Sequence, residues 1–150
     1  MLSRVLEGVL QEPAEPLRAG RYVILDAVGR GGLGEVYAAY DPELDRKVAI
    51  KLVRADVPEW GDLDKRMLRE AQAMAKIRHA NVVAIYDVGR FREQVFIAME
   101  LIEGATLSAW SRETTRDWSE VRDIFVQAAR GLAAVHAAGL VQRDFKPANV

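Results

Sequence analysis

Apolar and β-branched residues gather into five short segments in the first two thirds of the chain, and turn-forming residues separate them. The first three segments follow one another without a stretch long enough for a helical crossover, which predicts an antiparallel meander. Glycines after the first segment and Asp41-Pro42 after the second mark its turns. The predicted strands are 22–28, 35–40, 47–53, 82–88 and 94–101.

Two other parts of the chain have the spacing of apolar positions that is typical of helices. Residues 62–78 are rich in strong helix formers and predict one helix. After Gly104 the pattern is mostly helical, with Ser119 as the expected N-cap and Gly139 as the expected end of a long helix. The expected core-facing stripe of that helix is Val121, Ile124, Phe125, Ala128, Leu132 and Val135. The whole pattern predicts an α+β fold, in which a five-stranded antiparallel sheet with one helix precedes a helical segment.

The first twenty residues differ from the rest of the chain. Apolar residues at positions 2, 5, 6, 9 and 10 follow one helix face, which predicts a short amphipathic helix. Arg4 and Glu7 interrupt the apolar stretch, so it does not have the pattern of a secretory signal. Pro13 and Pro16 are typical of a linker, and the compact part is therefore expected to begin near Arg21.

Composition narrows the classes of function. The 150 residues carry 21 Lys and Arg against 22 Asp and Glu, so no field of one sign is available to hold nucleic acid or an anionic membrane. The absence of cysteine excludes disulfides, Cys nucleophiles and zinc–thiolate sites, and the apolar runs are too short to span a bilayer. We expect structural roles for both histidines: a local hydrogen bond for His79, and a core position on the inner face of a helix for His136.

Glycines recur in the pattern Gly29-x-Gly31-x-x-Gly34-x-Val36. Dinucleotide-binding folds share this spacing, but there a helix opens at the glycines and an acidic residue follows about twenty positions later. Here the segment 36–40 is β-like, and Lys51 stands twenty residues after Gly31. The pattern favours a hairpin that covers phosphates, with a plain glycine-rich hairpin as the alternative.

Lys51 ends the strand motif Val48-Ala49-Ile50-Lys51. Most lysines on strands keep their ammonium group in water at a sheet edge. The alternative is a cation at a phosphate site, held by a carboxylate partner. Glu70 supplies that carboxylate if it faces the sheet, whereas on a solvated helix face it pairs with Arg66.

The third motif is Gln142-Arg143-Asp144-Phe145-Lys146-Pro147-Ala148-Asn149. Lys146 and Asn149 follow Asp144 by two and five residues, which is the spacing of a kinase catalytic loop. With the glycine motif and Lys51 upstream in the same order, residues 21–150 resemble the eukaryotic-like protein kinase family. The stretch 29–37 is most similar to the bacterial serine/threonine branch. The resemblance implies a kinase N-lobe at 21–103 and the start of a helical C-lobe at 104–150, after an N-terminal segment and linker at 1–20.

The resemblance also implies a role for each matched residue. Asp144 would accept the proton of the substrate hydroxyl, Lys146 would neutralise the transferred phosphoryl group, and Asn149 would hold Mg²⁺. The remaining matched residues would bind ATP. The backbone of Gly29, Gly31, Gly32 and Gly34 would cover the phosphates, Lys51 with its partner Glu70 would bind them, Val36 and Ala49 would wall the base, and Met99 and the backbone from Glu100 to Ile102 would border adenine.

The sequence departs from the family pattern in two places. Gln142 stands where the family usually has His, which we expect to weaken the bracing of the loop without abolishing its chemistry. The sequence also ends at Val150, ahead of any Asp-Phe-Gly segment or activation loop, so we expect a truncated C-lobe with an exposed apolar surface.

The expected function is a cytoplasmic serine/threonine protein kinase that uses ATP and Mg²⁺ to phosphorylate protein Ser/Thr hydroxyls. One alternative is a non-catalytic fragment that binds nucleotide or docks on a partner protein. Another is a small-molecule phosphotransferase, which shares the Asp-x-x-x-x-Asn spacing, although Lys146-Pro147 argues against it. Self-association or partner binding is expected through the N-terminal helix or the C-lobe surface, with no nucleic-acid or membrane partner.

Overall fold

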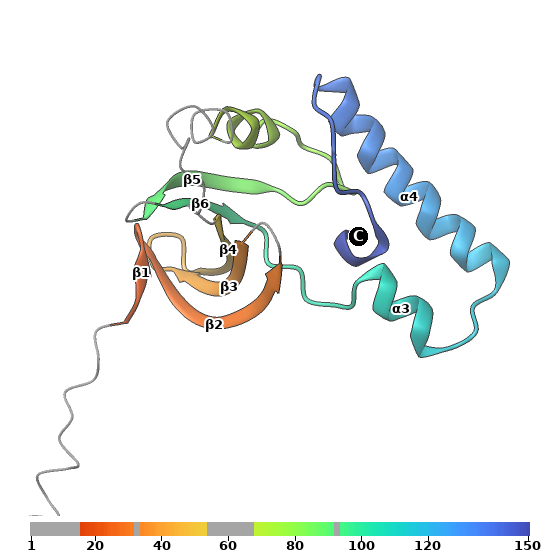
Figure 1. Ribbon diagram of the computed structural model, residues 1–150, viewed down its shortest axis with the longest axis horizontal. Coiled ribbons are helices and arrows are strands. Elements are labelled where there is room, and N and C mark those ends of the chain that lie inside the picture. Colours follow the sequence, from red (N-terminus) through yellow and green to blue (C-terminus); the bar gives the residue numbers. More distant parts are fainter. Residues whose placement is uncertain (1–15, 32–33, 54–67, 92–93) are drawn as a thin grey trace, which may run out of the picture.

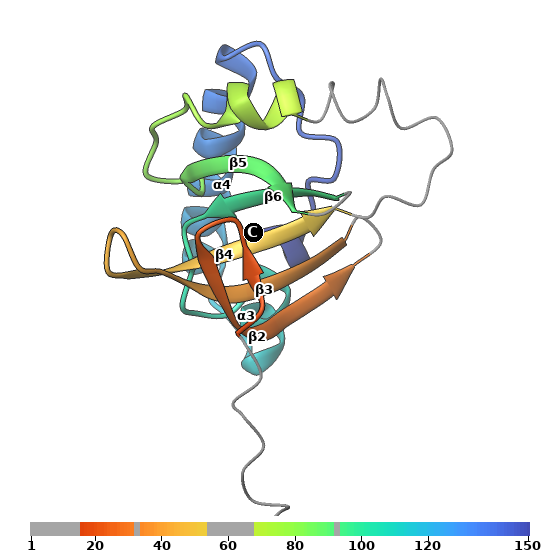
Figure 2. The same cartoon turned by 90° about the vertical axis from the view of Figure 1, so that its left-hand side faces the viewer.

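The computed structural model describes residues 16–31, 34–53, 68–91 and 94–150. The described part consists of an antiparallel sheet and a helical part, with the C-terminal segment between them (Figure 1). The strands follow the order β1-β2-β3-β4-β6-β5, and every neighbouring pair is antiparallel. Figure 2 shows the same sheet with α4 behind it. The strands are β1 (Arg18–Ala19), β2 (Tyr22–Gly31), β3 (Gly34–Asp41), β4 (Arg46–Val53), β5 (Ile85–Phe91) and β6 (Gln94–Met99).

The sheet has one strand more than the five that the sequence pattern predicted. Strand β1 pairs Arg18 with Val23 and Ala19 with Tyr22, across a turn in which Gly20 adopts a φ of 60°. Ala19 is fully buried. The sheet therefore begins before the boundary expected near Arg21, because two residues are too few to display a strand period. The predicted amphipathic helix lies outside the described residues.

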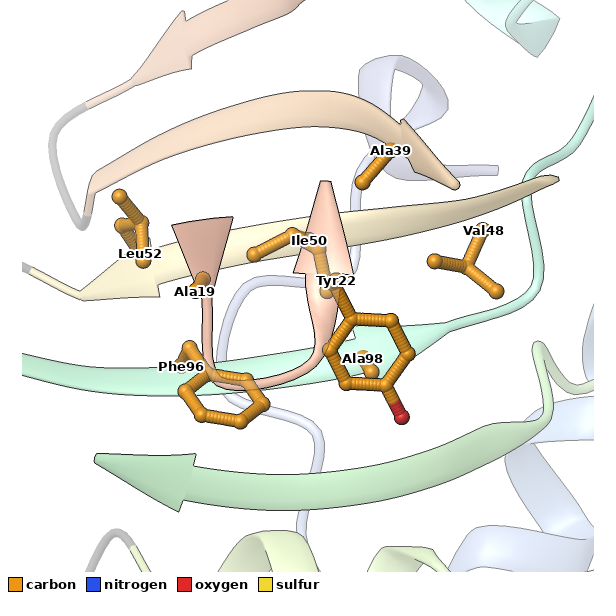
Figure 3. Close-up of a cluster of buried hydrophobic side chains, with 8 residues drawn as sticks. All are labelled: Ala19, Tyr22, Ala39, Val48, Ile50, Leu52, Phe96 and Ala98. Carbon is orange, nitrogen blue, oxygen red and sulfur yellow. The ribbon is translucent and has the colours of Figure 1, made fainter. Parts of the chain in front are cut away.

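The core lies on one face of the sheet (Figure 3). Val48, Ile50 and Leu52 alternate along β4 and point to this face, where they meet Tyr22 and Phe96. The Tyr22 and Phe96 rings pack edge to face, with 5.9 Å between their centroids. Since successive side chains of a strand point to opposite faces, Ala49 and Lys51 belong to the other face. The packing of the core therefore aims Lys51 away from it.

Three helical segments are described besides the short 3₁₀ turn η1 (Pro147–Asn149). They are residues 68–74, α3 (Leu107–Glu113) and α4 (Trp118–Ala137). The first ends four residues earlier than the predicted end at residue 78. Its last turn tightens, since the N–H of Ile77 donates to the carbonyl of Met74 three residues back. The predicted part at 62–67 lies outside the described residues.

The start of α4 differs from the prediction as well. Asp117, and not Ser119, is the N-cap: its carboxylate accepts from the N–H of Ser119, and the Glu120 carboxylate accepts from the N–H of Asp117. This reciprocal capping box satisfies two N–H groups at the helix start, which a hydroxyl at position 119 would not do. The predicted end holds, since α4 stops at Ala137 and Gly139 follows with a φ of 77°.

Helix α4 approaches the backbone of Asn81, in the segment before β5, through a glycine. A Cβ on Gly131 would lie 2.3 Å from the carbonyl oxygen of Asn81, so only glycine allows this approach. Within the expected stripe Val135 is buried, whereas Phe125 is half exposed. His136 is exposed, which corrects its expected core position, because it lies one residue beyond Val135 on the helix. None of the described helices is both long and apolar enough to cross a membrane.

Candidate active site

The sheet register brings three predicted site residues into one row. Gly29 on β2 pairs with Val36 on β3, and Val36 pairs with Lys51 on β4. Cross-strand partners share a face of the sheet, so Val36 and Lys51 lie side by side on the face opposite the core. The strand pairing thus places the glycine hairpin, an apolar side chain and a cation next to one another.

Gly34 closes the hairpin in a conformation that requires glycine. Its φ is 143°, and an added Cβ would lie 2.0 Å from the carbonyl oxygen of Leu52. Gly31 pairs directly with Gly34, whereas a Cβ on Gly29 would meet no atom within 4 Å. Close contact with the neighbouring backbone thus explains why residue 34 is glycine, whereas Gly29 leaves open space above the strand. Gly32 lies outside the described residues.

A second row across the sheet joins two residues of the predicted adenine pocket. Ala49 pairs with Met99 at the end of β6, and Ala49 lies two residues from Lys51 on the same face. Just beyond β6, the Glu100 N–H donates to the Ala84 carbonyl at 2.9 Å. Glu100 can therefore offer adenine only its carbonyl. Ile102, a residue that is 59% exposed, lies farther along the connection to α3.

The predicted catalytic residues form a hydrogen-bonded cluster after α4. The Lys146 ammonium lies 2.8 Å from one carboxylate oxygen of Asp144. The Asn149 side-chain nitrogen donates to the other oxygen at 2.9 Å and to the Asp144 main-chain carbonyl at 2.8 Å. Pro147 begins η1, whose tight turn carries Asn149 back toward Asp144. Lys146 and Asn149 are thus both brought to the Asp144 carboxylate.

The electrostatics of this cluster favour an ionised carboxylate. The hydrogen bond from Lys146 is the largest cause that lowers the pKa of Asp144, followed by the one from Asn149. The charge of Lys51 lowers the pKa of Asp144 in addition. The cation from the sheet and the carboxylate from the loop therefore act on each other, although they come from the two halves of the molecule.

We predict that Lys146→Met raises the pKa of Asp144 toward the ordinary value for aspartate, about 3.9. A lowered pKa means that the ionised Asp144 stabilises the fold above pH ~4, and that this stabilisation is lost as the pH falls through the folded-state pKa. Titration of the Asp144 carboxyl by NMR measures the change. Lys47→Met, on the exposed turn side of β4, is the control, and equal pKa values in the two variants would contradict the geometry.

Glu70 has an ion-pair partner in the catalytic loop. One of its carboxylate oxygens lies 3.5 Å from the Arg143 guanidinium, and both side chains are about half exposed or more. The sequence offered Lys51 or Arg66 as the partner of Glu70; Arg66 lies outside the described residues, and the pairing with Lys51 stays a prediction. The structure adds a direct link from the helix at 68–74 to the residue before Asp144.

Asn149 has a side-chain oxygen with the chemistry to ligate Mg²⁺ together with phosphates. With its nitrogen donating to Asp144, Asn149 can offer a cation only its oxygen. Mg²⁺ in such sites takes one or two carboxylates and completes its shell with phosphate oxygens and water. The described residues contain no cluster of three or more His, Asp or Glu that would hold a metal without a phosphate ligand. The Asn149 oxygen is thus suited to a cation that also has phosphate oxygens among its ligands.

A cavity of about 450 Å³ opens between α4 and the segment 80–83. Glu100, Ile102 and Asn149 are part of its wall, whereas Lys51 and the glycines of the hairpin are not. The cavity thus borders the predicted site from the α4 side and is not itself the space in front of Lys51. The strand register gathers the predicted site residues around Lys51, and the hydrogen bonds gather them around Asp144.

Two further results concern His79 and a charged pair on the glycine hairpin. His79 accepts a hydrogen bond from the Asn81 N–H on its Nδ1 at 3.1 Å, which confirms its structural role. Arg30 and Glu35, to which the sequence analysis gave no role, are cross-strand partners with 2.5 Å between guanidinium and carboxylate. Their opposite charges on the two sides of a glycine turn would have indicated this pair once the hairpin register was known.

Comparison with known proteins supports the predicted fold and the family resemblance. The family described as Protein kinase domain matches residues 22–150. Serine/threonine-protein kinase PknD of Chlamydia pneumoniae is 38% identical over 142 residues, which cover 87% of this chain and 15% of that protein. Serine/threonine-protein kinase PrkC of Bacillus subtilis is 38% identical over 133 residues, covering 88% of this chain and 20% of that protein.

The solved structures agree with the sequence relatives. The Mycobacterium tuberculosis PknI kinase domain is 27% identical and superposes with a TM-score of 0.78, covering 92% of this chain and 57% of that domain. The chain thus spans a fifth or less of the two curated relatives and somewhat more than half of a solved kinase domain.

Proposed function

Because this chain belongs to the protein kinase family, we propose that it binds ATP with Mg²⁺ and supplies the nucleotide-binding lobe and catalytic loop of a serine/threonine protein kinase. The observation that carries the proposal is the cluster of Asp144, Lys146 and Asn149. The Lys146 ammonium and the Asn149 side-chain amide both contact the Asp144 carboxylate. A cytoplasmic location and protein Ser/Thr hydroxyls as acceptors belong to the same proposal.

Each residue of the cluster has a task that its geometry permits. Asp144 is ionised at neutral pH, so it can orient the acceptor hydroxyl and take its proton. Lys146, beside that carboxylate, can stabilise the negative charge of the phosphoryl group during transfer. Mg²⁺, once bound with ATP, would neutralise phosphate charge, with Asn149 as a ligand. Transfer of a phosphoryl group depends mainly on such positioning and charge stabilisation.

On the sheet side, Lys51 is proposed to bind the ATP phosphates beneath the glycine hairpin. Val36 and Ala49 lie on the same face and would supply apolar contacts to the base. Met99 and the Glu100 carbonyl border the far end of this row. This face is therefore arranged as a nucleotide would require, with Ala49 and Met99 in one row and Val36 beside Lys51 and Gly29 in the other.

We expect Lys51→Met to weaken binding of Mg·ATP to this chain by about tenfold or more, since a charged hydrogen bond contributes about 1.5–3 kcal/mol. Isothermal titration calorimetry measures the dissociation constant. Lys47→Met removes the same charge from an exposed position of β4 and should leave it unchanged. Equal affinity in the wild type and Lys51→Met would contradict the proposed phosphate site, and binding without any phosphoryl transfer would favour a non-catalytic nucleotide-binding fragment.

A further inference from the structure

Three polar side chains outside the proposed site gather on the glycine hairpin. Arg30 on β2 and Glu35 on β3 are direct cross-strand partners, and the guanidinium Nη2 lies 2.5 Å from the carboxylate Oε1 of Glu35. The Tyr37 hydroxyl donates to the other carboxylate oxygen, Oε2. Both oxygens of Glu35 are thus engaged, one from each strand of the hairpin.

This cluster stands at the end of the hairpin that carries the glycines. Arg30 and Glu35 form the register pair next to Gly31 and Gly34, which close the hairpin. Glu35 and Tyr37 alternate with Val36, so they lie on the face away from Lys51. The cluster therefore acts on the hairpin from behind, where a nucleotide in front of Lys51 would not touch it.

The cluster is also anchored to the core. Tyr37 is partly buried and packs against the hydrophobic core, and the Glu35 side chain is only 24% exposed, whereas Arg30 is 72% exposed. An ion pair with one partly buried partner is screened less than a fully exposed pair. Tyr37 donates a hydrogen bond to Glu35, and Glu35 pairs with Arg30 on β2. These contacts connect the glycine end of β2 to the hydrophobic core.

We propose that Arg30, Glu35 and Tyr37 form a clasp that positions the glycine hairpin over the phosphates of a bound nucleotide. The inference rests on the proposed function. Glycine-rich backbone is costly to order because glycine has the largest conformational freedom to lose. A clasp that limits this freedom before binding lowers the entropy cost of bringing the backbone N–H groups to the phosphates. The three side chains are positioning residues, since they act through the hairpin backbone.

This role makes a specific prediction for ligands with and without phosphates. Arg30→Gln and Glu35→Gln should each weaken ATP and ADP binding by about threefold, an effect within the range that a surface ion pair contributes. Adenosine, which has no phosphates for the hairpin to cover, should bind all three proteins equally. Calorimetry with the full chain measures the three dissociation constants, and Mg²⁺ is present throughout.

Two further variants separate positioning from simple stability. Arg30→Lys keeps the charge and should retain most of the ATP affinity, and the swap of both charges, Arg30→Glu with Glu35→Arg, should restore much of what each single change removes. Arg122→Gln is the matched control, because it breaks an exposed ion pair of 2.7 Å with Asp123 on α4. It should change none of the affinities.

The outcomes separate the clasp from the proposed function. Equal loss of ATP and adenosine binding in Arg30→Gln and Glu35→Gln, or no loss at all, would overturn the clasp but would not contradict the proposed function. If the wild type binds no nucleotide, the proposed function fails, and hydrogen exchange of the amides at 29–31 and 34–37 decides the clasp alone. Faster exchange in Arg30→Gln than in Arg122→Gln supports it, and equal exchange overturns it.

Discussion

Asp144→Asn is expected to slow phosphoryl transfer by about 10²-fold, toward the lower end of the 10²–10⁴-fold range for general base catalysis. The reason for the lower end is the low pKa of Asp144, which the hydrogen bonds from Lys146 and Asn149 maintain. A carboxylate with a low pKa is a weak base. Most of its contribution must then come from orienting the acceptor hydroxyl, which suits a reaction that depends on positioning.

The measurement uses radiolabelled ATP and a Ser/Thr-containing protein acceptor. It is made on a form of the chain that is extended to the length of a kinase domain, because the matched part of this chain covers 57% of the PknI kinase domain. Binding of Mg·ATP should stay within about twofold of the wild type, since the proposed role of Asp144 is toward the acceptor and not the nucleotide.

Asp123→Asn provides the matched control, because it makes the same change on the exposed surface of α4. It should leave both the rate and the ATP affinity unchanged. Transfer by Asp144→Asn at the wild-type rate would show that another group orients the hydroxyl. Loss of ATP binding in Asp144→Asn would instead place the carboxylate at the nucleotide.

Five of the six strands could be predicted from sequence because each carries its own local signal, although β5 (Ile85–Phe91) begins and ends three residues later than the predicted strand 82–88. Alternation along β4 separates Val48, Ile50 and Leu52 from Lys51, and this separation alone fixes which face bears the cation. Strand β1 carries no such signal, since two residues cannot show a period and its formation depends on the turn at Gly20 and on burial of Ala19. Strand β1 therefore depends on tertiary structure and not on a local sequence pattern.

The cap of α4 was within reach of the sequence but was assigned to the wrong residue. Both Asp117 and Ser119 are good N-caps, and the choice depends on the residue three positions later. Glu120 follows Asp117 by three residues, and the structure shows the two side chains bonded reciprocally to the backbone. Residue type alone did not decide between two candidates; the spacing of the second partner did.

The candidate site also has a part that could be predicted from sequence and a part that could not. Asp144, Lys146 and Asn149 lie within six residues, so the motif spacing and one tight turn suffice to bring them together. The partner of Glu70 depends on how the helix at 68–74 is rotated against the catalytic loop, which no local pattern encodes. The structure gives Arg143 as an ion-pair partner, a residue that the sequence analysis did not consider for Glu70.

Gly34→Ala is expected to lower the free energy of unfolding by about 3 kcal/mol, the sum of overpacking and an unfavourable backbone conformation. At this position the added Cβ would lie 2.0 Å from the Leu52 carbonyl oxygen, and the φ of 143° is one that residues with a side chain rarely adopt. Relief requires β3 to move away from β4 at the Gly34–Val53 pair. Urea denaturation followed by circular dichroism measures the change.

Two other glycines make this prediction discriminating. A Cβ at Gly104 or at Gly29 would meet no atom within 4 Å, and neither residue has a positive φ. Both alanine variants should therefore unfold within about 0.5 kcal/mol of the wild type. Gly29→Ala should still weaken Mg·ATP binding, since its added carbon occupies the open space that the phosphates are proposed to fill, whereas Gly104→Ala should not. Equal stability of Gly34→Ala and Gly104→Ala would contradict the hairpin geometry, because the contact with Leu52 leaves no room for a side chain.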